Sequence, residues 1–189
     1  MSLNLTKGQN INLSKEAPGL TKAIVGLGWD TNKYDGGAFD LDATAAGLNA
    51  EGKLVTDNEF VFFNNLNNPS GTISHSGDNL TGEGNGDDEQ ITIDLAAVPA
   101  EIQKVQFAIT IYQGKERGQN FGIVENAYAR VIDGATDTEI VRVDLTEDHS
   151  AHTTVIAGEF YRHNGDWKFK ALDQGINPGG IEELVASYK

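Results

Sequence analysis

Five acidic side chains gather in a glycine-rich stretch, residues 77–89, which reads Gly-Asp-Asn-Leu-Thr-Gly-Glu-Gly-Asn-Gly-Asp-Asp-Glu and contains neither Lys nor Arg. Like charges held this close repel one another, and a folded loop must offset that repulsion. A bound hard cation does so, because Ca²⁺ is bound by carboxylate, carbonyl and amide oxygens on flexible loops. Asp, Asn and Gly are also ordinary turn residues, and most acidic loops are only solvated. The stretch alone leaves both interpretations open.

Two further acidic groups precede this stretch. Trp29-Asp30 ends one predicted strand, and Phe39-Asp40-Leu41-Asp42 lies in the next. Alternation along a strand puts Asp40 and Asp42 on one face, with Phe39 and Leu41 toward the core. If the two strands pair, Asp30 comes near the Asp40 and Asp42 pair. Asn64, at the end of a short aromatic strand, adds an amide oxygen. Because calcium takes about six to eight oxygens, we expect several loops to share one site.

Three known motifs partly match residues 77–89 and fail. Asp78 and Glu89 have the spacing of the first and last ligands of an EF-hand loop, but Glu83 stands where that loop needs glycine. The spaced glycines of residues 82–86 lack the Gly-Lys-Ser/Thr of a phosphate-binding loop. The nonapeptide calcium repeat needs several copies, and the chain has one glycine-rich stretch. What remains is half of a split site, completed by the carboxylates of distant strand ends.

The composition excludes several classes of function. The 189 residues carry a net charge of -14 and no Cys. A protein that grips nucleic acid without sequence preference needs a basic face, so we predict no nucleic-acid partner. Without Cys there are no disulfides or thiolate metal sites, and no flavin or nicotinamide motif is visible. We therefore predict no enzymatic activity and no small-molecule substrate. No apolar run approaches the roughly 20 residues of a membrane helix, so we expect a cytoplasmic protein.

The dominant hydrophobic period is two, the signature of strands. Asn164-Gly165 is a strong hairpin signal, because a type I′ turn needs positive φ at both positions. Helical spacing occurs in the tail, Ile181 to Tyr188. The pattern predicts an all-β fold, an antiparallel β-sandwich with a few short helices including a C-terminal one, formed by residues 1–189 as a single domain. The main candidate strands are Ala23–Trp29, Phe39–Leu48, Phe60–Phe63, Ile91–Leu95, Val105–Ile111, Ala127–Asp133, Glu139–Leu145, Thr153–His163 and Trp167–Leu172.

One pair of histidines has a spacing that would let them share a metal ion. His149 and His152 are three residues apart, directly after Glu147 and Asp148. Histidines so spaced can share a transition metal. The acidic neighbours favour instead a solvated polar loop, which is our expectation for this segment.

Taken together, the motifs resemble the TerD family of bacterial tellurium-resistance and stress-response proteins. The resemblance spans nearly the whole chain, and the order and spacing of the motifs make it specific. The motifs are Gly26-Leu27-Gly28-Trp29-Asp30, Phe39-Asp40-Leu41-Asp42-Ala43, Phe63-Asn64-Asn65, Gly77-Asp78-Asn79, residues 81–89, Gln119-Asn120-Phe121-Gly122, residues 158–165 and Trp167-Lys168-Phe169.

The resemblance implies a β-sandwich that binds calcium at loops on one end, and we expect two ions. It also implies a role in tellurite resistance or chemical stress, within a complex of stress proteins near the inner face of the membrane. The ligands implied by the motifs are Asp30, Asp40, Asp42, Asp78, Asp87, Asp88 and Glu89, with Asn64, Asn79 and Glu83 as second choices.

Two other functions use the same carboxylates. A sandwich with calcium at its tip could bridge to lipid phosphate, as C2-like domains do, by analogy of architecture alone. Paired carboxylates such as Asp40 and Asp42 could also serve a metal-dependent hydrolase, although no substrate cleft is indicated. We favour a calcium-binding interaction module over both.

Overall fold

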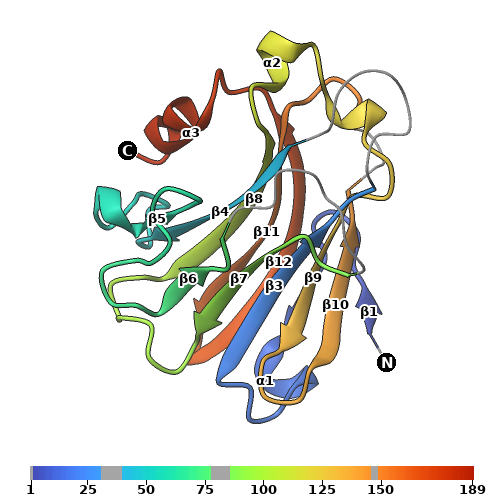
Figure 1. Ribbon diagram of the computed structural model, residues 1–189. Coiled ribbons are helices and arrows are strands. Elements are labelled where there is room, and N and C mark those ends of the chain that lie inside the picture. The colour runs from blue at the N-terminus through green and yellow to red at the C-terminus, as the bar shows by residue number, and fades with distance from the viewer. Residues whose placement is uncertain (1, 31–39, 78–85, 146–148) are drawn as a thin grey trace.

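The computed structural model describes residues 2–30, 40–77, 86–145 and 149–189 (Figure 1). Its strands form two six-stranded sheets that face each other, and neighbouring strands are antiparallel except for β1 and β10. The predicted all-β sandwich is therefore confirmed.

The first sheet has the strand order β1-β10-β9-β3-β7-β6. It places β3 between β9 and β7, so that the end of β3 lies beside the start of β7, with Leu27 opposite Glu89. Its strands are β1 (Leu3–Asn4), β10 (Thr138–Asp144), β9 (Tyr128–Asp133), β3 (Lys22–Gly28), β7 (Glu89–Asp94) and β6 (Ile73–His75).

The second sheet has the order β2-β12-β11-β8-β4-β5. Its longest strands, β11 and β12, form the predicted hairpin, with φ of 53° at Asn164 and 86° at Gly165. Both positive angles are what a type I′ turn requires. The strands are β2 (Asn10–Asn12), β12 (Asp166–Ile176), β11 (Thr154–His163), β8 (Lys104–Ile111), β4 (Leu41–Leu48) and β5 (Phe60–Val61).

The core fills the space between the sheets. Alternate residues point inward, as the two-residue period requires; in β7, for example, Ile91 and Ile93 are buried. In the second sheet the Phe160 ring meets Phe107 and Phe169 edge-on, with centroids 5.2 and 5.3 Å apart. This core fixes which residues of each strand face outward.

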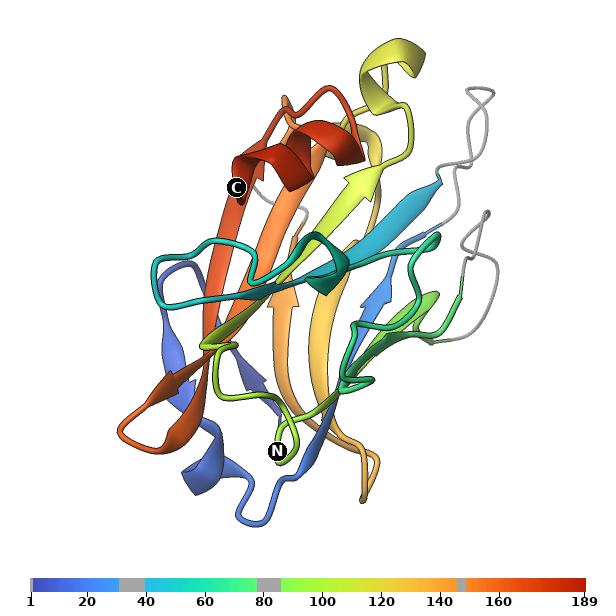
Figure 2. The ribbon, with the colours of Figure 1, turned by 90° about the vertical axis from the view of Figure 1, so that its left-hand side faces the viewer.

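Short helices lie between and after the strands of the sandwich. The predicted C-terminal helix is present as α3 (Ile181–Ser187), which crosses the outer face of the second sheet (Figure 2). It buries Leu184 and Tyr188 there, against a small second cluster that includes Ala108 and Ile156. The other helices are α1 (Leu13–Glu16), α2 (Gly114–Arg117) and the 3₁₀ turns η1 (Asp57–Glu59) and η2 (Phe121–Ile123). Within the described residues, no helix is long and apolar enough to cross a membrane.

Candidate metal site

The candidate site lies at the end of the sandwich where β3 ends and β4 and β7 begin. The strands β3 and β4 belong to different sheets, so the condition that they pair is not met. Glu89 joins the sheets instead, because its Oε2 accepts a hydrogen bond of 2.6 Å from the Ala43 N–H on β4. The start of β4 therefore lies against the start of β7 across the sandwich, and not beside β3 in one sheet.

Asp30 and Asp88 occupy the rim of this end. The Oδ2 of Asp88 accepts a hydrogen bond of 3.0 Å from the Trp29 N–H, and the Oδ2 of Asp30 accepts one of 2.6 Å from the Asn126 amide. Burial raises the pKa of Asp88, the Trp29 N–H opposes that rise, and the charges of Asp87, Glu89 and Asp30 add to it. Negative charges are therefore held close together here, which is the repulsion that a cation would relieve.

Asp87 has a different environment, on the outer face of the first sheet. Its Oδ1 lies 2.7 Å from Arg130 Nε and its Oδ2 lies 3.1 Å from Arg130 Nη2. Tyr128 Oη and Gln90 Nε2 add hydrogen bonds of 3.1 and 3.0 Å. Gly26 makes room for this group, since a Cβ there would lie 2.0 Å from Asp87 Oδ2. The guanidinium already balances the Asp87 charge, and nothing in the sequence pattern had singled out Arg130.

Glu89 points inward, between the sheets, where its side chain is fully buried. The Nδ1 of His75 accepts a hydrogen bond of 3.0 Å from the Gly77 N–H, so the proton of the neutral ring resides on Nε2. That Nε2 lies 3.2 Å from both Ala43 O and Glu89 Oε2. Glu89 and His75 together satisfy the backbone of Ala43 on the side of β4 that lies away from β8. The role of His75 was not predicted from the sequence.

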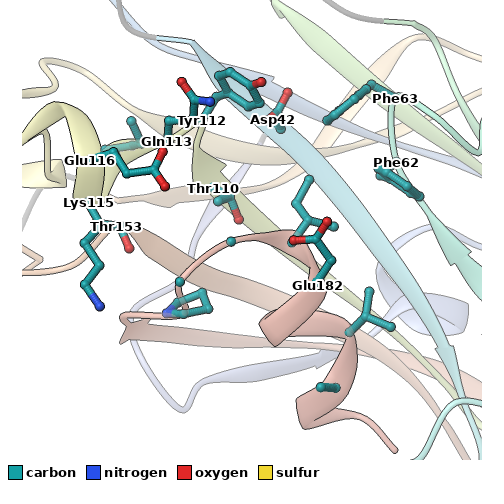
Figure 3. A pocket seen from close by; sticks show the side chains of 18 of the residues that line it. Asp42, Phe62, Phe63, Thr110, Tyr112, Gln113, Lys115, Glu116, Thr153 and Glu182 are labelled. Carbon is teal, nitrogen blue, oxygen red and sulfur yellow. The ribbon is translucent and has the colours of Figure 1, made fainter.

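The side chain of Asp42 points to the outer face of the second sheet, away from the core. Leu41 and Ala43 point into the core, and Asp42, only 2% exposed, faces a cavity of about 680 Å³ between the second sheet and α3. Figure 3 shows most of the residues that line this cavity, among them Asp42, Phe63 and Thr110. Asn64 lines the same cavity. Asp40 directly precedes β4, where its carbonyl accepts a hydrogen bond of 2.7 Å from the Tyr112 N–H.

The structure thus brings Asp30 and Asp88 together at the rim and Asp42 and Asn64 together at the cavity. Asp87 and Glu89 adjoin the rim but have protein partners of their own. Asp78, Asn79 and Glu83 lie outside the described residues. In residues 2–30, 40–77, 86–145 and 149–189, no three His, Cys, Asp or Glu side chains form a group that could hold a metal ion. The donors predicted here are all oxygens, which fits calcium better than zinc or copper.

The geometry defines a class of protein: a two-sheet β-sandwich that concentrates carboxylates where strands of both sheets end. The TerD domain model matches residues 1–188, and the chain belongs to the TerD family.

Relatives across bacteria share this family. General stress protein 16U of Bacillus subtilis (strain 168) is 51% identical over 189 residues, covering 100% of this chain and 97% of that protein. Tellurium resistance protein TerD of Serratia marcescens is 48% identical over 188 residues, covering 100% of this chain and 97% of its own length. A solved structure of a homologue of telluride resistance protein (TerD) from Streptomyces coelicolor A3(2) superposes with a TM-score of 0.74 at 26% identity, covering 90% of this chain and 99% of that one. The family and the sandwich fold predicted from the sequence are confirmed.

Proposed function

We propose that this protein is a calcium-binding module of the bacterial stress response that works by binding partner proteins rather than by catalysis. Its relatives carry the names general stress protein and tellurium resistance protein. The observation that carries the calcium proposal is the crowding of Asp30, Asp87, Asp88 and Glu89 around one strand end, where Asp87 is paired with Arg130. Calcium would add positive charge to this group.

The rim carboxylates Asp30 and Asp88 are the ligands we assign first. Both are anchored by backbone or amide hydrogen bonds, which orient the carboxylates at the ends of β3 and β7. Asp87 and Glu89 contribute charge close by while keeping their protein partners. Asp78, Asn79 and Glu83 complete this site in the proposal, and Asp40, Asp42 and Asn64 serve a second ion. When bound, calcium would neutralise the carboxylates and hold the ends of β3 and β7 together.

Direct reduction of tellurite by this chain is not part of the proposal. Reduction of tellurite needs electrons from a thiol, a flavin or a redox metal, and the chain has no Cys. We further propose that the protein works in the cytoplasm, within complexes of stress proteins at the inner face of the membrane. Calcium would act there as a structural or regulatory ion.

Calcium titration of the purified protein tests the proposal. A metal that binds only the folded state stabilises it by about 2.7 kcal/mol at 100-fold excess over Kd, so calcium should raise the melting temperature and chelator should lower it. The indole of Trp29, adjacent to Asp30 and 5% exposed, offers a fluorescence signal for the same event. The double variant Asp30→Asn/Asp88→Asn should lose most of the calcium affinity.

The matched control removes two exposed carboxylates elsewhere, in the variant Glu16→Gln/Glu51→Gln, with the same change in net charge. This control should bind calcium as the wild type does. If calorimetry detects no binding to the wild type at millimolar calcium, the proposed function is wrong.

A further inference from the structure

A second polar site lies away from the acidic end, in a cavity of about 640 Å³ between β1, β10 and β12. It shares no residue with the candidate calcium site. The strands β1 and β10 form one edge of the first sheet (Figure 1), and β12 supplies the wall from the second sheet. His149 and His152 line this cavity together with Asp173 and Gly175.

His149 is not the solvated residue expected from its acidic neighbours. It is only 4% exposed, and its Nε2 lies 2.5 Å from Asp173 Oδ1. The carboxylate accepts a hydrogen bond from Nε2–H, which leaves a lone pair on Nδ1 of the neutral ring. That Nδ1 is buried and has no hydrogen-bond partner among the described residues.

His152 repeats this situation beside it. Its Nδ1 is also buried, and no residue of the described ranges hydrogen-bonds to it. The two imidazole rings lie edge to face, with centroids 5.8 Å apart and an interplanar angle of 67°. Buried polar atoms almost always have a hydrogen-bond partner, so two buried nitrogens without one, side by side, indicate a ligand.

Gly175 lies against both nitrogens. A Cβ on this residue would lie 2.3 Å from His152 Nδ1 and 2.8 Å from His149 Nδ1. Only a residue without a side chain fits here, because the two imidazole rings already occupy that place. The two Nδ1 atoms are therefore close neighbours beside the Gly175 backbone.

We propose that His149 and His152 bind a transition-metal ion of the zinc type through their Nδ1 atoms, with Asp173 as a positioning residue. Imidazole nitrogen suits zinc, copper and nickel, whereas calcium prefers oxygen. A carboxylate on the far nitrogen of a ligating histidine is the usual arrangement, because it fixes the tautomer and the ring orientation. The Asp173–His149 pair has this form.

The protein supplies two ligands from its described residues, since no group of three His, Cys, Asp or Glu is found there. Zinc takes four ligands, so water or an external ligand fills the remaining positions from the cavity. Lys7, Arg142 and Asp144 also line this cavity, so its charged side chains carry both signs. The site is thus an open one, distinct in donor chemistry from the acidic end.

The experiment is a zinc titration of the full chain, followed by calorimetry, with millimolar calcium present to occupy the carboxylates. We expect one zinc ion per chain. His149→Ala/His152→Ala should abolish this binding, and His163→Ala, which removes the exposed histidine at the β11–β12 turn, should leave it unchanged. Asp173→Asn should weaken zinc binding by about 10- to 100-fold without abolishing it.

Nuclear magnetic resonance of the wild-type imidazole nitrogens makes the test independent of how the variants fold. The chain has four histidines, so each ring can be followed separately. Zinc should move the Nδ1 signals of His149 and His152 and leave those of His75 and His163 in place. Signals that do not move, or that move only at His75 or His163, would overturn the proposal. Either result leaves the calcium titration unaffected.

Discussion

At the scale of single residues, the acidic cluster separates into carboxylates with different partners. Asp87 is held by Arg130, and its side chain is fully buried while that of Arg130 is 27% exposed. Glu89 is held by the Ala43 N–H and His75. Asp88 accepts a backbone hydrogen bond and lies among like charges. Residues that are neighbours in sequence therefore have different electrostatic roles.

This difference predicts opposite profiles for two neighbouring substitutions. Asp88→Asn should reduce calcium affinity at least about tenfold, because it removes a rim ligand and a charge. Asp87→Asn should reduce calcium affinity less, since Arg130 already balances that charge. It should, however, destabilise the apo protein by about 1–3 kcal/mol, because the Asp87 carboxylate is lost from a buried hydrogen-bond network. Calcium calorimetry and urea unfolding of the two variants measure both effects. A larger loss of calcium affinity in Asp87→Asn would make Asp87 the principal ligand.

At the scale of elements, the sequence predicts strands with strong alternation and misses the short strand β6. The strands from β7 to β12 were predicted to within a few residues, because each buries alternate apolar side chains. The strand β6 was missed, since Ile73 is the single apolar residue among its three positions. Whether β3 pairs with β4 was left open, because alternation gives the faces of a strand but not its neighbours, and the structure places them in different sheets. Strand ends were predictable in this chain, and their assembly into sites was not.

The segment before β6 is held by side-chain hydrogen bonds in addition to its backbone hydrogen bonds with β6. Asn68 accepts a hydrogen bond of 2.9 Å from the Ile73 N–H and donates one of 2.8 Å to Glu59 Oε2 in η1. Glu59 is 6% exposed. Burial raises its pKa, the Asn68 hydrogen bond opposes that rise, and Glu101 adds to it. A carboxylate that is costly to ionise thus anchors this connection.

The raised pKa predicts a pH-dependent contribution to stability. The folded state binds the Glu59 proton more tightly than the unfolded state, so its contribution is full below the unfolded pKa and is lost as pH rises through the folded one. The side chain introduced by Glu59→Gln cannot ionise. The free energy of unfolding of this variant, relative to that of the wild type, should therefore increase as pH rises from about 4 to 7. Urea unfolding across this range measures the difference. Glu51→Gln, at an exposed turn, should show no such trend, and a flat difference for Glu59→Gln would contradict the assignment.

At the scale of the whole molecule, the net charge of -14 acts against the folded state through self-repulsion. Sodium chloride should raise the melting temperature by screening this repulsion, because the Debye length falls from about 30 Å at 0.01 M to about 10 Å at 0.1 M. Calcium should do more at equal ionic strength, since it would bind the crowded carboxylates around Asp88 in the folded state and find no such cluster in the unfolded chain. Thermal unfolding in calcium chloride and in sodium chloride of matched ionic strength separates the two effects.

Magnesium chloride is the control for divalent charge, and it should stabilise less than calcium, because magnesium demands a tighter octahedral shell and dehydrates reluctantly. Equal melting temperatures in all three salts would mean that screening alone accounts for the stabilisation. If the extra rise in melting temperature caused by calcium disappears in Asp30→Asn/Asp88→Asn, the ion binds at the junction of β3 and β7.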